Sequence, residues 1–383
     1  MTSALFFCQF FAVGVYFTFL NVYLRAMGLS GSEIGLIGTL SGILSMIGTF
    51  GWGYLADRTG NPRMLIAIGA VGAFLAAQLM PLVPQFGLEP AAWYFAAISA
   101  LVGLLWSAVN TLIDSTAVAM LGDQRQKYGI YRLGGSFGYI IGGTASGFLY
   151  DWGGYGWMFP AFALVMSVFA ALALLLPARV SRLVGSGQQE LGRMIRQREW
   201  LILMISLLLF WVGFHMSFVF GGVILKEMGA SDQLISIASV IGSVVELPFM
   251  AFSARLLKRF GAPRLFVAGL LMQTLRFFLL AQMRVPEWAI VINMLNGPGY
   301  VLLWNSAVDL VARLAPPGLG ATSQGFMTSA LNLASILSAA VSGVIYDQLG
   351  FVGLYYIVGA LSLGALIVFG VGLIRRDPRP IEA

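Results

Sequence analysis

Twelve long apolar stretches, separated by short segments rich in Gly, Pro and charged residues, make up most of the chain. A membrane-spanning helix needs about 20 mostly apolar residues, which is the scale of these stretches. Glycine and proline favour the breaks because both interrupt regular structure. The pattern predicts helices over residues 4–26, 33–56, 63–83, 92–120, 129–150, 155–177, 200–226, 233–257, 264–283, 288–314, 320–346 and 351–374. We therefore predict an all-α integral membrane protein with twelve transmembrane helices.

The composition supports this class and excludes others. Of the 383 residues, 59% are hydrophobic and 10% are charged, whereas about a quarter of a soluble domain is charged. The first apolar stretch has neither a preceding basic segment nor a small-residue cleavage site, so we expect it to stay as a membrane helix. Because Cys8 and His215 are the single residues of their types, neither an intrachain disulfide nor a zinc site is expected. The sequence contains no phosphate-binding loop of the G-x-x-x-x-G-K-[ST] type, so nothing in it indicates ATP hydrolysis.

The basic residues are distributed unevenly between the two sides of the predicted bundle. If the N-terminus is cytoplasmic, 17 of the 22 lysines and arginines fall in cytoplasmic segments and three, Arg25, Lys226 and Arg284, fall outside. The positive-inside rule then places both termini in the cytoplasm. This bias explains the net charge of +6, so we expect a lipid bilayer and no nucleic acid as the partner.

The two halves of the chain repeat one another. Residues that return 201 positions later without a gap include Leu24, Met27, Gly28, Arg58, Gly60 and Arg63. Farther along, Asn110, Asp114 and Tyr150-Asp151 return as Asn305, Asp309 and Tyr346-Asp347. The polar stretch 178–199 lies between the copies, which predicts two pseudo-symmetric six-helix bundles, 1–177 and 200–383, joined by a cytoplasmic linker. Parallel six-helix repeats with a solute site between them are typical of one large class of secondary transporters.

A motif between the second and third spans identifies that class. The segment Gly53-Tyr-Leu-Ala-Asp57-Arg58-Thr-Gly60-Asn-Pro-Arg63 resembles the loop motif of the major facilitator superfamily, and the resemblance covers essentially the whole chain. Physically the motif predicts a gating latch, in which Gly53 permits close helix approach and Asp57 accepts hydrogen bonds from an exposed helix N-terminus. In the second copy Lys258 replaces the aspartate, so we expect the latch chiefly in the first half.

A closer resemblance lies in spans 1, 4 and 5. The segments around Phe10–Phe19 and Tyr128–Ser136 are similar to those of lactose permease and its relatives, the proton-coupled oligosaccharide, nucleoside and phenylpropionate permeases. The resemblance implies that Arg132 faces the substrate and that Asp114 is its acidic partner. It also matches Arg276 to an arginine of the ninth helix and Glu246 to an acidic position in the phenylpropionate branch. The histidine and glutamate that couple protons in lactose permease are replaced by Asn296 and Gly299.

Five ionisable residues inside predicted spans are the main functional candidates, because a charge facing lipid is costly. They are Asp114, Arg132, Glu246, Arg276 and Asp309. Polar residues three or four positions away share a helix face with these charged residues. The guanidinium of an arginine can donate paired hydrogen bonds to hydroxyl or carboxylate oxygens of a substrate. Our substrate-binding candidates are Asn110, Asp114, Arg132, Ser136, Tyr139, His215, Trp304, Asn305 and Asp309. Structural alternatives stay open: an Asp114–Arg132 pair kept for folding, and a packing role for His215 or Trp304.

Proton coupling requires an acid whose protonation is linked to conformation. Glu246 with Arg276 on successive spans is the leading candidate pair, followed by Asp309 and Asp114. A structural, permanently ionised Glu246 is the alternative. Gly134, Gly138 and Gly142 form a separate small-residue stripe that predicts helix packing.

These patterns predict a secondary transporter and not an enzyme, with a small polar organic solute as substrate and the proton as coupling ion in place of a cofactor. Saccharides, nucleosides and aromatic acids stay open as substrates. Lipid flipping is disfavoured by the polar residues inside the spans, and membrane-embedded catalysis lacks a nucleophile motif or a metal-ligand cluster. A proton-independent facilitator or exchanger and a drug or lipid exporter are the alternatives. We expect a monomer in a membrane of the bacterial inner-membrane type.

Overall fold

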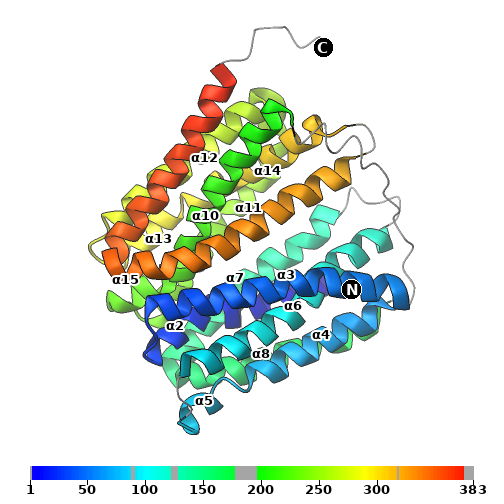
Figure 1. The fold of residues 1–383 in the computed structure, drawn as a ribbon, viewed down its shortest axis with the longest axis vertical. Helices are drawn as coiled ribbons and strands as arrows, with labels where there is room; N and C mark the ends of the chain where they lie inside the picture. Colours follow the sequence, from blue (N-terminus) through cyan, green and yellow to red (C-terminus); the bar gives the residue numbers. More distant parts are fainter. Residues whose placement is uncertain (1, 88–90, 122–127, 177–195, 317–318, 375–383) are drawn as a thin grey trace.

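The computed structural model describes residues 2–87, 91–121, 128–176, 196–316 and 319–374 (Figure 1). Within these ranges the secondary structure is helical and no strand occurs. Nine helical segments of the described residues are long and apolar enough to cross a membrane. One of them, Thr322–Gly372, contains the turn at Gly350, whose φ of 64° breaks the helix. The prediction of an all-α membrane protein is confirmed.

Twelve passes follow the predicted order, with ends that differ by a few residues from the prediction. The first half contains α1 (Thr2–Ala12) with the π-helix η1 (Val13–Phe17) and α2 (Thr18–Ala26), α3 (Gly31–Thr59), α4 (Pro62–Ala77) with α5 (Leu82–Gln85), α6 (Ala91–Leu121), α7 (Tyr128–Gly153), and η3 (Tyr155–Trp157) with α8 (Met158–Leu174). The second half contains α10 (Arg198–Glu227), α11 (Asp232–Phe260), α12 (Ala262–Ala281), α13 (Trp288–Asn293) with α14 (Asn296–Leu314), and α15 (Gly320–Ile374), which makes the last two passes.

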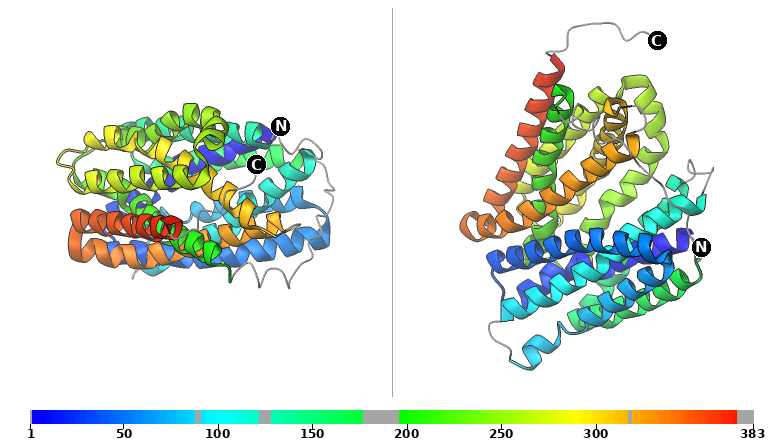
Figure 2. Two further views of the ribbon diagram at one scale, coloured as in Figure 1. Left: turned by 90° about the horizontal axis from the view of Figure 1, so that it is seen from above. Right: turned by 45° about the vertical axis from the view of Figure 1, so that its right-hand side comes forward.

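The two halves form two helical layers, one above the other in Figure 1, and α3 runs beside the first part of α15 along their border in Figures 1 and 2. On the other border α7 packs against α11. Most of the predicted linker, 178–199, lies outside the described residues. Its last two residues are helical, because α10 already begins at Arg198.

The π-helix in the first pass is held by side chains of α7. A π-turn shifts the helical hydrogen-bond ladder and leaves carbonyl groups without their usual partner. Tyr150 OH donates to the carbonyl of Val15 at 2.6 Å, and Ser146 Oγ lies 3.3 Å from the carbonyl oxygen of Gly14 and 2.7 Å from that of Gly143 on its own helix. Since an unsatisfied carbonyl is costly away from water, these bonds fix η1 against α7.

The Gly134/Gly138/Gly142 stripe packs α7 against α1, as predicted. A Cβ at Gly134 or Gly142 would lie 2.5 or 2.6 Å from the carbonyl oxygen of Ser3 or Phe11, and one at Gly138 would collide with the carbonyl of Phe7. Backbone atoms cannot yield as a flexible side chain does. The stripe therefore sets the separation of the two helices.

We expect Gly138→Ala to destabilise the protein by about 1–3 kcal/mol through overpacking. The melting temperature of the purified protein in detergent measures this. Gly51→Ala, also in a helix, is the matched control because a Cβ there meets nothing within 4 Å. Equal melting temperatures for the two variants would contradict the packing role.

The halves are joined at one end of the molecule, which we call the closed end: the end of α2 and start of α3, the end of α7, the end of α10 and start of α11, and the Gly350 turn. Asp347 of α15 accepts hydrogen bonds from the backbone N–H groups of Gly31 and Ser32 at 2.8 and 2.7 Å. Asp151 of α7 does the same for Asp232 and Gln233 at 2.8 and 2.9 Å. Each carboxylate thus caps the N-terminus of a helix in the opposite half, where the helix dipole favours negative charge.

An ion pair and two close helix contacts reinforce the closed end. Arg25 Nε lies 2.7 Å from Glu227 Oε1 across the halves. A Cβ at Gly35 would lie 2.6 Å from the carbonyl oxygen of Ala339, and Ser236 donates to the carbonyl of Gly143. Backbone contact between α3 and α15 and between α7 and α11 therefore closes this end.

Candidate functional site

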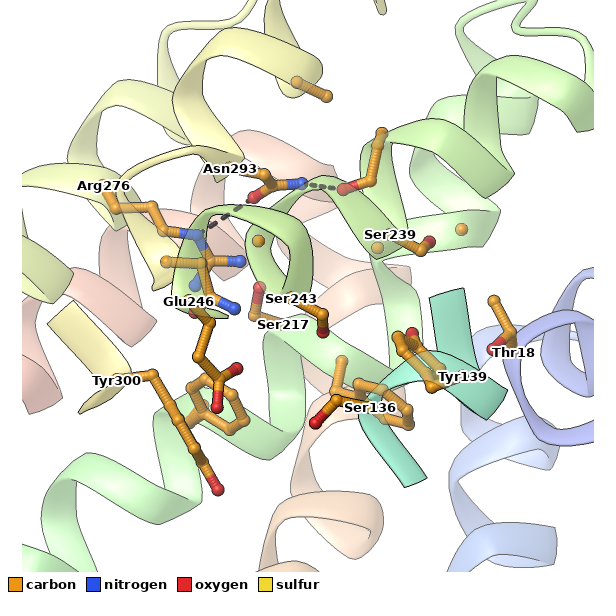
Figure 3. Close-up of a pocket in the computed structure, with 18 of the residues that line it drawn as sticks. Thr18, Ser136, Tyr139, Ser217, Ser239, Ser243, Glu246, Arg276, Asn293 and Tyr300 are labelled. Atoms are coloured by element: carbon orange, nitrogen blue, oxygen red, sulfur yellow. Dashed lines mark hydrogen bonds between the residues drawn. The ribbon is translucent and has the colours of Figure 1, made fainter. Parts of the chain in front are cut away.

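A cavity of about 490 Å³ lies between the two halves. α1, η1, α2 and α7 contribute one wall, and α10 to α15 contribute the other. Its polar lining combines hydroxyl, amide and charged side chains, several of which point toward one another in Figure 3. The chemistry-bearing residues of the lining are Thr18, Arg132, Ser136, Tyr139, Ser217, Ser239, Ser243, Glu246, Arg276, Asn293, Asn296, Tyr300, Trp304, Asn305 and Tyr355.

Two opposite charges from different halves line this cavity. Arg132 belongs to α7 of the first half and Glu246 to α11 of the second half. Tyr300 of α14 lines the same cavity. Glu246 is half-buried.

Arg276 of α12 lies in a network of amide groups on the second-half wall. Its Nε donates to Asn293 Oδ1 at 3.0 Å and its Nη1 donates to Gln273 Oε1 at 3.1 Å. Asn293 Nδ2 in turn donates to the carbonyl of Ala238 at 2.9 Å, and Gln273 Nε2 donates to Asn296 Oδ1 at 3.1 Å. Because both amide nitrogens are occupied, both amide oxygens face the guanidinium.

Aromatic rings form the part of the second-half wall contributed by α10 and α14. Tyr300 and Trp304 stack at an interplanar angle of 4° with centroids 6.2 Å apart. Trp211 packs edge-on against both rings. Phe214 lies against Tyr300 at 6.0 Å. Such a wall offers a flat apolar surface to a ring-shaped solute.

Several predicted site residues line the cavity together: Arg132, Ser136, Tyr139, Glu246, Arg276, Trp304 and Asn305. No ion pair within 4.0 Å joins Glu246 to Arg276, both of which the structure describes, and Arg276 bonds to amide oxygens instead. Their roles in transport stay predictions.

Other candidates lie away from the cavity lining. Asp309 pairs with Arg313, four residues on, at 2.7 Å, so its carboxylate has a local partner on its own helix. Asn110 accepts a hydrogen bond from Gln9 at 2.6 Å. His215 packs beside Trp211, ring centroids 5.6 Å apart. Asp114 is half-buried and is not without a partner. Its pairing with Arg132 stays a prediction.

The loop motif has only part of its expected geometry in this structure. Gly60 ends α3 in the left-handed conformation at φ 65°, as a C-terminal glycine does. Arg63 donates to the carbonyl of Leu176, at 3.3 Å, within the same half. The expectation of close helix approach at Gly53 is wrong here, since a Cβ would meet nothing within 4 Å. The latch roles of Asp57 and Arg58 stay predictions.

The sequence analysis missed two sets of residues. Asn293 and Gln273 orient Arg276, and nothing in an isolated amide side chain signals such a role. Asp151 and Asp347 were recognised as repeated, but their role as helix caps was not. The signal for that role is their position just before a helix break at the same place in both halves. Within the described ranges, no cluster of three His, Cys, Asp or Glu residues could hold a metal ion.

Comparison with known proteins places the chain among transporters. Residues 1–357 match the model of the MFS_1 like family. The maltose permease of Geobacillus stearothermophilus is 29% identical over 94% of this chain and 92% of its own length. A crystal structure of the nucleoside transporter NupG matches with a TM-score of 0.78 at 18% identity, covering 98% of both chains. The crystal structure of a D-xylose-proton symporter matches with a TM-score of 0.73 at 18% identity, covering 96% of this chain and 95% of the symporter chain.

Proposed function

Because the chain belongs to the MFS_1 like family of membrane transporters, we propose that it moves a small polar organic solute by alternating access together with a proton. The matches to permeases along nearly the whole chain make it a transporter and not an enzyme. The proton, the site residues and the class of solute are the parts of this proposal that go beyond the family.

The observation that carries the proton proposal is that Arg132 and Glu246, opposite charges from different halves, line one cavity. The two charges belong to different halves, so rocking of the halves changes the distance between them. Protonation of Glu246 removes one charge of the pair and thereby changes the relative free energies of the two conformations. Glu246 is therefore the acid, and Arg132 its movable positive partner.

The lining supports a ring-bearing polar solute. The Tyr300–Trp304 stack offers a face for a sugar, nucleobase or phenyl ring, and Ser136, Tyr139 and Asn305 offer hydrogen bonds. The names of similar proteins, a maltose permease and a D-xylose-proton symporter, support a saccharide and a proton. Nucleosides and aromatic acids fit the same wall.

We assign the closed end to the extracytoplasmic side, since the basic segments favour cytoplasmic termini. The cavity then faces the cytoplasm in this conformation, and the protein functions as a monomer in a bacterial inner membrane. Substrate entry from outside requires Asp151 and Asp347 to release the helix ends that they cap.

Proton flux in liposomes tests the proposal. Purified protein is reconstituted with a pH-sensitive dye inside, and disaccharides, nucleosides and aromatic acids are added one at a time. Acidification of the interior on adding one compound is the expected result and names the solute class. Equilibration of a radiolabelled compound without proton movement would make the protein a facilitator or exchanger.

A further inference from the structure

Arg276 stands out among the buried charges of the described chain. Only Asp232 and Arg276 are charged residues with almost fully buried side chains there, at 4% and 8% exposure. Asp232 is neutralised by Lys226, whose Nζ lies 2.8 Å from its Oδ1. Arg276 instead has the neutral oxygens of Asn293 and Gln273 as partners. A guanidinium stays charged at any physiological pH.

A buried cation whose partners are all neutral lacks an opposite charge. Taking a charge out of water costs several kcal/mol unless an opposite charge and hydrogen bonds replace the water. No described carboxylate lies within 4.0 Å of Arg276. Glu246 lines the same cavity but makes no ion pair with Arg276. The wall thus presents a positive charge that the protein leaves unneutralised.

The surrounding network prepares Arg276 to bind an anion. Asn293 and Gln273 are each anchored through their amide nitrogens and hold the guanidinium by two of its nitrogens. An arginine has five N–H donors, so donors remain after these two bonds. A planar guanidinium fixed in this way matches a carboxylate in geometry as well as in charge.

We infer that Arg276 binds a carboxylate of the transported solute, whose ring lies against Tyr300 and Trp304, so that the substrate class is a small cyclic or aromatic carboxylic acid. Asn293 is the positioning residue that orients Arg276. This inference rests on the proposed transport function and narrows its solute class. A carboxylate at Arg276 would supply the negative charge that this wall lacks.

Ligand binding by the purified protein in detergent, without a membrane or a gradient, tests the inference. The probes are three matched pairs: benzoate and benzamide, cyclohexanecarboxylate and its amide, glucuronate and glucose. Affinity is measured from the shift in melting temperature and from quenching of tryptophan fluorescence. At least one acid is expected to bind about tenfold or more tightly than its neutral partner, as a charge-assisted bond implies.

Three variants separate an anion site from a structural role. Asn293→Asp places a carboxylate where the amide oxygen now lies, 3.0 Å from Arg276 Nε. It should therefore raise the melting temperature and abolish the preference for acids. Arg276→Gln should abolish the preference as well. Arg284→Gln, an exposed arginine outside the cavity lining, should leave it unchanged.

Two results would overturn the inference: failure of all three acids to bind at millimolar concentration, or an acid preference that survives in Asn293→Asp. The inference and the symport proposal fail separately. An acid that binds at Arg276 but drives no proton flux would contradict symport alone. A neutral sugar that drives proton flux while no acid binds would contradict the carboxylate site alone.

Discussion

Glu246→Gln is expected to abolish solute accumulation driven by a pH gradient while leaving solute exchange intact. Glutamine keeps the shape of the side chain but cannot bind and release a proton, so the charge opposite Arg132 in the cavity lining no longer depends on protonation. One-to-one symport accumulates solute about tenfold per unit of pH difference, and in the variant this ratio should fall to one. Uptake of radiolabelled solute into proteoliposomes after a pH jump measures accumulation, and counterflow measures exchange.

Asp309→Asn is the matched control for this prediction. Asp309 was also a coupling candidate, but its carboxylate pairs with the exposed Arg313, and a solvent-exposed pair within one helix contributes little. The control should accumulate solute like the unmodified protein. Loss of accumulation in Asp309→Asn, with normal accumulation in Glu246→Gln, would move the coupling role to Asp309.

Asp151→Ala combined with Asp347→Ala is expected to shift the protein toward a conformation in which the closed end is open. The pair removes both carboxylate caps, each of which accepts at least two backbone hydrogen bonds at a helix N-terminus. At about 0.3–1 kcal/mol for an exposed charge at a helix end, the two together shift the equilibrium roughly tenfold.

Spin labels measure that shift. Met27 and Leu349 are exposed and lie in different halves at the closed end, so labelled cysteines there, in a Cys8→Ser background, should tolerate the probe. Double electron–electron resonance should show a larger population at long distance in the double variant. Glu287→Ala, which removes an exposed acid whose side chain makes no capping hydrogen bond, is the control. An unchanged distance distribution in the double variant would show that the caps do not hold this end closed.

The passes could be predicted because a membrane constrains their length and composition together. Apolar stretches bounded by glycine, proline and charge gave all twelve, even where Gly350 alone separates the last two. The Gly134/Gly138/Gly142 stripe also predicted its packing contact, since small residues four apart share one helix face. Both features depend on local sequence alone.

Side-chain pairing inside the bundle could not be predicted in the same way. Sequence spacing tells which residues share a helix face, but the rotation of each helix decides which neighbour that face meets. Spacing therefore paired Glu246 with Arg276 of the next pass, whereas no ion pair joins these two described residues and Arg276 bonds to amide oxygens. Asp309 shows a second limit of spacing: Arg313 stands four residues away, and the same rule that linked Asp309 to Asn305 also offers the ion pair seen in the structure.

The duplicated caps at the closed end have a consequence for the origin of the protein. Asp151 and Asp347 occupy corresponding places in the two halves, and each caps the corresponding helix of the opposite half. One six-helix unit thus contains both the acid and the helix end that the contact requires. Two identical copies of such a unit can join through one contact made twice, as a symmetric homodimer does. An ancestral dimer would therefore have possessed a closed state before gene fusion, and a single substitution in it would have altered both contacts at once.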